Sequence, residues 1–134
     1  MTTGRMIAGG LLAGLVLNIG EALLHGFLFA EQTAAAMAAL GKDATGSPVG
    51  LSLLLAVTFA QGVIGVWLGA ASKQSAVVMG LALWALSGLY SATYFWAGFP
   101  GVIPDGVLWG PAACEVVLYP LAMLAGYRVT RSSL

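Results

Sequence analysis

The sequence predicts an all-α integral membrane protein: a four-helix transmembrane bundle in up-and-down order, forming a single domain over residues 1–134. Two observations predict this fold. The chain is 60% hydrophobic and only 7% charged, which is too little charge to cover a soluble globule of its 134 residues. It also contains four apolar stretches that reach the roughly 20 residues needed to cross a bilayer. The connections between them leave no room for a separate soluble domain.

The first predicted span covers residues 6–30 and contains Asn18 and Glu21. Its apolar run is longer than the roughly 7 to 15 residues of a signal-peptide core, so we expect a retained span. Cleavage near the small residues at 34–36 is the alternative. Residues 31–48 then form an outer loop. Its alanine-rich start predicts a short interfacial helix that ends at Gly41, followed by a turn over residues 42–48.

The other three predicted spans cover residues 49–71, 76–97 and 107–127. Only residues 72–75 separate the second span from the third, which predicts a tight antiparallel hairpin. The loop over residues 98–106 contains Pro100 and Pro104 and is equally short.

The distribution of basic residues predicts the orientation. Four spans put both termini on one side of the membrane, and four basic residues fall on that side: Arg5, Lys73, Arg128 and Arg131. The opposite side carries one basic residue, Lys42, among the acidic residues Glu31, Asp43 and Asp105. By the positive-inside rule both termini are cytoplasmic, in a multi-pass protein of the bacterial inner membrane.

Composition and motifs also exclude several functions. Five basic residues balance five acidic ones, so we expect no nucleic-acid partner. Cys114 is the single cysteine, which excludes a disulfide or a cysteine-based metal cluster within one chain. The sequence has no P-loop, no G-x-S-x-G motif and no H-E-x-x-H motif. We therefore predict a protein that is not an enzyme, with no catalytic residue, no cofactor and no metal.

Small residues at helical spacing predict close helix contacts. Gly10 with Gly14, and Gly65 with Gly69, are small-xxx-small pairs that let two backbones approach. These faces support the leading functional hypothesis. The protein acts in the bilayer through helix contacts, as a homo-oligomer or as an accessory subunit of a larger membrane complex.

Each span also carries polar side chains on one face, at a similar predicted depth. At about 1.5 Å rise per residue, Glu21 lies roughly 13 Å, and Glu115 roughly 12 Å, below the outer surface. A carboxylate in hydrocarbon costs roughly 2.5 to 3.5 kcal/mol on insertion scales, so it requires a partner or a function. The candidate ligand-binding or proton-binding residues of this layer are Asn18, Glu21, His25, Gln61, Tyr90, Tyr94, Glu115 and Tyr119.

Several interpretations of this layer remain open. The carboxyls can be neutral and hydrogen-bonded to the tyrosines, Gln61 and His25 in a network that fixes helix register. They can instead exchange a proton for a cationic or amphipathic substrate that stacks on the tyrosines and Trp84. His25 can be an axial ligand of a haem or chlorophyll-type pigment, or the two glutamates and His25 can form a dinuclear metal site.

One resemblance bears on the second interpretation. The small size, the four spans and Glu21 in the first span are similar to the small multidrug resistance transporters. The resemblance covers this architecture and this one residue type, and it implies a proton-coupled transporter of cationic substrates. The segment LVLNIGEALLHG differs from that family's first-helix motif, and Glu115 and His25 are additional to it.

Overall fold

The computed structural model describes residues 2–42 and 47–131, and every regular element in these ranges is helical. Four helical segments are long and apolar enough to cross a membrane: Thr3–Leu28, Pro48–Ala71, Ala76–Gly98 and Asp105–Thr130. This confirms a multi-pass, all-α membrane protein. Each observed segment lies within a few residues of its predicted span.

Two of the four segments contain a π-helical turn that the sequence pattern does not predict. The first segment consists of α1 (Thr3–Leu23) and η1 (Leu24–Leu28). The third consists of α4 (Ala76–Trp84), η2 (Ala85–Leu89) and α5 (Tyr90–Gly98). A π-turn accommodates one extra residue, so the residues after it are rotated relative to an uninterrupted α-helix.

The predicted loop helix is present as α2 (Ala30–Ala39). Gly41 follows its C-cap residue, and the Gly41 φ of +66° is a left-handed conformation that glycine adopts without strain. The Lys42 amide bonds the Met37 carbonyl and the Gly41 amide bonds the Ala38 carbonyl, both at 2.9 Å. These two bonds form a Schellman motif, so glycine terminates α2 as predicted. Most of the turn predicted after Gly41, including Asp43, lies outside the described residues.

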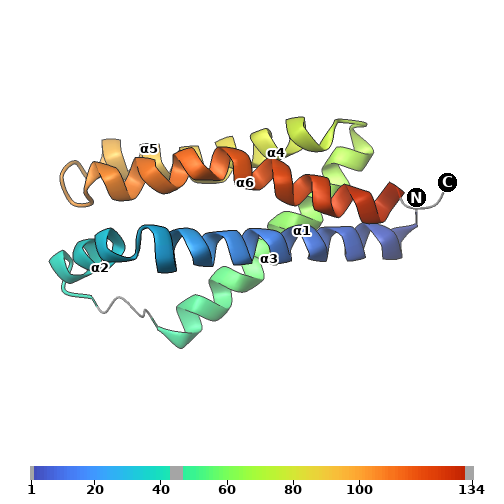
Figure 1. Cartoon of the computed structure of the whole chain (residues 1–134). Coiled ribbons are helices and arrows are strands. Elements are labelled where there is room, and N and C mark those ends of the chain that lie inside the picture. Colours follow the sequence, from blue (N-terminus) through green and yellow to red (C-terminus); the bar gives the residue numbers. More distant parts are fainter. Residues whose placement is uncertain (1, 43–46, 132–134) are drawn as a thin grey trace.

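The first helix is central to the packing. α1 contacts both α3 (Pro48–Ala71) and α6 (Asp105–Arg131), and α4 packs on the other side of α6 (Figure 1). The first turn of α1, the last turn of α6 and the α3–α4 turn lie at the same end of the molecule (Figure 1). α3 crosses α1 obliquely, and its first turns lie away from the other helices (Figure 1). The buried core comprises Ala13, Leu17, Val66, Ala76, Met79, Tyr119, Ala122, Met123 and Tyr127.

Glycine contacts hold α1 against α3. A Cβ on Gly14 would lie 2.7 Å from the Phe59 Cα atom, and one on Gly10 would collide with the Val63 backbone. On the facing helix, Gly62 lies against the backbones of Gly10 and Gly14. The two helices therefore touch backbone to backbone, which dispersion and shape fit favour in a bilayer.

The second predicted glycine pair also packs inside the chain. Gly65 lies against Leu83 and Met123, and Gly69 lies against the hydroxyl end of Tyr127. All the predicted packing glycines are therefore occupied by contacts within one chain.

Candidate functional site

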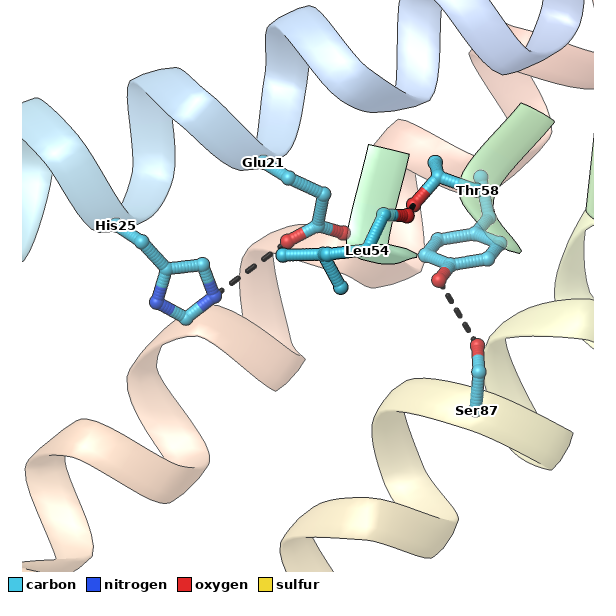
Figure 2. Close-up of polar contacts among 6 residues, drawn as sticks. Glu21, His25, Leu54, Thr58 and Ser87 are labelled. Carbon is cyan, nitrogen blue, oxygen red and sulfur yellow. Dashed lines mark hydrogen bonds and ion pairs between the residues drawn. The ribbon is translucent and has the colours of Figure 1, made fainter. Parts of the chain in front are cut away.

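Three ionisable side chains meet inside the membrane-spanning part of the molecule. Glu21 and His25 come from the first segment and Glu115 comes from α6. One oxygen or nitrogen atom of each lies within 4.8 Å of the others. The His25 Nε2 and Glu21 Oε2 atoms lie 3.4 Å apart (Figure 2). We call these three residues the Glu–His–Glu cluster.

The local backbone explains how Glu21 and His25 meet. They are four residues apart, a spacing that places side chains on one helical face. His25 lies in the π-turn η1, which closes with a 2.7 Å bond from the Phe29 amide to the Leu24 carbonyl. Both side chains are partly accessible: 43% of the His25 side chain and 23% of the Glu21 side chain are exposed.

Glu115 is the buried member of the cluster. Only 7% of its surface is exposed, and its Oε2 atom has no hydrogen-bond partner among the described residues. Gly88 of η2 lies directly against this carboxyl group, where any Cβ would collide with it. One turn earlier on α6, the Ala112 carbonyl accepts a 2.7 Å hydrogen bond from the Trp84 indole. The helix that carries Glu115 is thus fixed against α4, with space for the carboxyl provided by a glycine.

The cluster borders a cavity of about 530 Å³. Asn18, Gln61 and Tyr119, all predicted site residues, line the same cavity. Its other walls are mostly apolar and come from the first half of α3, from η2 and α5, and from the start of α6. Since α3 and α5 make no contact with each other in the described structure, the cavity lies where the bundle is open. A cavity of this size and lining suits a small ligand.

The polar layer is less connected than the predicted network. Three of its polar side chains bond a carbonyl four residues earlier on their own helix: Asn18 to Gly14, Thr58 to Leu54 (Figure 2) and Ser87 to Leu83, at 2.8 to 2.9 Å. One hydrogen bond crosses between helices here, joining Ser87 to the Tyr119 hydroxyl at 2.9 Å (Figure 2). The cluster is therefore not tied into a wider hydrogen-bonded network in the described residues.

The structure does not bring Tyr90 and Tyr94 to the cavity. They are 63% and 51% exposed on α5, and their rings stack with centroids 6.1 Å apart. The π-turn η2 explains the difference, because it rotates α5 relative to the regular helix assumed in the prediction. Ala92 consequently faces the bundle instead and is 4% exposed.

Sequence reasoning missed Gly88, which admits the Glu115 carboxyl. Gly88 does not lie on the polar face predicted for the third span, and its importance depends on a side chain from another helix. A pattern within one helix gives no signal for such a residue.

Chemically, the cluster offers two carboxylates and one imidazole beside a cavity, and these groups can hold a cation or a metal ion. The His25 Nε2 atom is directed at the Glu21 carboxylate, so an ion held there would be shared by both residues. Comparisons of the chain with protein-family models, curated proteins and solved structures give no match. The fold and the cluster therefore define it only as a multi-pass helical membrane protein with a partly buried cluster of ionisable side chains.

Proposed function

We propose that this protein is a small membrane carrier that binds a cation at Glu21 and Glu115 and exchanges it for protons. The observation that carries the proposal is the buried Glu115 carboxyl, with its unpartnered oxygen inside a membrane span. A carboxyl among apolar groups is stable as a neutral acid or as a carboxylate beside a cation. These two forms correspond to the protonated and the loaded states of an exchanger.

The open side of the bundle supports a route for the substrate. The first turns of α3 expose their apolar side chains, including Leu51 at 55% and Leu54 at 60%, and these two residues also line the cavity. An amphipathic cation can enter between α3 and α5 and reach the carboxylates with its charged end. The resemblance to the small multidrug resistance transporters supports the same chemistry.

Transport into proteoliposomes tests the proposal. A pH-sensitive dye is trapped inside, and ethidium or Co²⁺ is added outside. We expect the internal pH to rise as the cation enters and protons leave. Glu115→Gln should abolish this change, whereas Glu31→Gln, on the exposed carboxyl of α2, should not. Equal pH traces for wild type and Glu115→Gln with both cations would contradict the carrier function.

A second candidate is the helix-contact hypothesis, in which the chain forms a homo-oligomer or joins a larger membrane complex. The glycine faces are occupied within the chain, so a partner has to use other surface. The outward-facing pair of Tyr90 and Tyr94 favours this candidate, because a phenol hydroxyl in lipid gains a hydrogen-bond partner from another chain. Mass determination after mild detergent extraction tests it: a single-chain particle contradicts it, and a complex lost in Tyr90→Phe/Tyr94→Phe supports it.

We also propose that both termini face the cytoplasm of a bacterial cell. Arg5, Lys73 and Arg128 supply the basic residues of the positive-inside rule. The start of α1, the end of α6 and the α3–α4 turn lie together at one end of the molecule, as this orientation requires (Figure 1). It puts the cluster nearer the outer surface.

A further inference from the structure

We propose that Glu21, His25 and Glu115 bind one divalent first-row transition metal ion of the Zn²⁺ class. This inference names the cation of the carrier proposed above and rests on that proposal for its physiological role. The metal site itself rests on separate observations, namely the spacing of the donor atoms, the burial of Glu115 and the charge of the three groups.

The spacing of donor atoms matches a metal site. Ligands about 2.0 to 2.1 Å from a tetrahedral ion lie roughly 3.3 Å from one another. The distance from His25 Nε2 to Glu21 Oε2 is 3.4 Å, so these two atoms can ligate one ion without rearrangement. Because the two residues are four apart, the helical backbone keeps their side chains close to each other.

Glu115 supplies the third ligand from a different helix. No two of the three donor atoms lie more than 4.8 Å apart. Bringing the widest pair to the roughly 3.3 Å of a tetrahedral site therefore requires a movement of at most about 1.5 Å. A change in the Glu115 side-chain torsions provides it. Its Oε2 atom is buried without a partner in the described structure, and a metal ion supplies the interaction that this atom lacks.

The charges favour a divalent ion over an organic monocation. Two carboxylates and a neutral imidazole carry two negative charges, which one divalent ion neutralises. A monovalent cation leaves one negative charge uncompensated in an apolar region, which is costly. Mixed imidazole and carboxylate ligands select zinc and its neighbours over Mg²⁺ and Ca²⁺, which prefer oxygen ligands alone. The cavity beside the cluster leaves a coordination position for water or a second ligand.

Cobalt is the probe for the test, because Co²⁺ occupies zinc-type sites and has visible absorption bands that depend on its ligands. The protein, freed of any purification tag, is titrated with Co²⁺ in a mild detergent. We expect one ion per chain and displacement by Zn²⁺. Loss of a residue that only orients a metal ligand typically lowers metal affinity by about 10- to 100-fold. Loss of a ligand itself should cost more, so we expect Co²⁺ binding to weaken by about 100-fold or more in each of Glu21→Gln, His25→Gln and Glu115→Gln. Glu31→Gln is the matched control and should bind as wild type.

Gly88→Ala tests the geometry without removing a ligand. The added methyl displaces the Glu115 carboxyl, so Co²⁺ binding should weaken by about 10- to 100-fold. Gly98→Ala has no atom within 4 Å of the new methyl and should not change binding. A melting curve for each variant, followed through Cys114 reactivity, separates loss of the site from loss of the fold.

The outcomes separate this inference from the carrier function. Equal Co²⁺ affinity in wild type and Glu115→Gln, or an unchanged spectrum in folded His25→Gln, would overturn the metal site. Stoichiometric Co²⁺ binding without proton movement in proteoliposomes leaves the metal site standing and removes the carrier. Proton movement driven by ethidium, in a protein that does not bind Co²⁺, removes the metal site and leaves the carrier function standing.

Discussion

Gly62→Ala should destabilise the protein by forcing α1 and α3 apart. The new Cβ would lie 2.8 Å from the Gly14 Cα atom and closer still to the Gly10 oxygen and the Gly14 nitrogen. Carbon atoms in contact normally lie about 3.5 to 4.0 Å apart, so the helices must separate by about 1 Å. All three opposing atoms belong to the backbone, and no change of rotamer relieves the clash.

The cost follows from the contacts that this separation weakens. A gap of about 1 Å removes up to half of each atom-pair attraction of about 0.1 to 0.2 kcal/mol. With on the order of 30 pairs along the contact, the loss is about 2 kcal/mol, within the usual range for overpacking. Alanine recovers up to about 1 kcal/mol through its helix propensity. The net loss for Gly62→Ala is therefore about 1 kcal/mol.

Gly26→Ala is the matched control, because its new methyl has no atom within 4 Å. It should gain up to about 1 kcal/mol from helix propensity alone. The two variants should differ by about 2 kcal/mol, which corresponds to about 8 °C in melting temperature. Cys114, the single and half-buried cysteine, reports unfolding when heated with a thiol-reactive dye in detergent. If the melting temperature of Gly62→Ala equals or exceeds that of Gly26→Ala, the backbone contact between α1 and α3 is refuted.

Further predictions concern the third segment and the orientation. Trp84→Phe removes the indole hydrogen bond to α6 and should cost about 1 to 2 kcal/mol in the same melting assay, whereas Trp67→Phe, at a 52% exposed position, should cost less than 0.5 kcal/mol. Ser75→Ala removes the N-cap of α4, whose hydroxyl accepts a 3.2 Å bond from a backbone amide, and should cost about 1 kcal/mol; an unchanged melting temperature would contradict the cap. In a Cys-free background, an impermeant thiol reagent should label Val102→Cys in intact cells and Gln74→Cys only after permeabilisation; the opposite pattern would reverse the orientation.

The spans could be predicted from the sequence because hydropathy and short turns define them independently of packing. The second span, for example, was predicted at residues 49–71 and is observed as Pro48–Ala71. The end of the loop helix was also predictable, since Gly41 terminates it through its own backbone conformation. In both cases the information lies within one contiguous stretch of sequence.

The site was predictable only in part, because helix periodicity assumes a regular helix. Glu21, His25 and Glu115 meet as their depths suggested. The π-turn η2 interrupts the third segment and turns Tyr90 and Tyr94 away. Nothing in the order of apolar and polar residues distinguishes a π-turn from an α-turn, so the sequence gives no sign of this rotation.

The roles of the glycines were equally dependent on their partners. Gly10 and Gly14 were identified by their spacing, but Gly62, which faces both, was missed. Spacing identifies a helix that can approach another closely, and it does not identify the partner. Consequently, the predicted glycine faces suggested self-association, whereas the structure places their contacts within one chain.

The packing of α1 against α6 has a consequence for biosynthesis. The first span is synthesised long before the last, and a chain growing at about 5 to 20 residues per second takes roughly 5 to 19 seconds to extend from Glu21 to Glu115. During that interval Glu21 and His25 have neither α6 nor its carboxyl beside them. If the metal site forms as proposed, it forms last, after the fourth span has entered the bilayer, and loading with the ion then marks completion of the bundle.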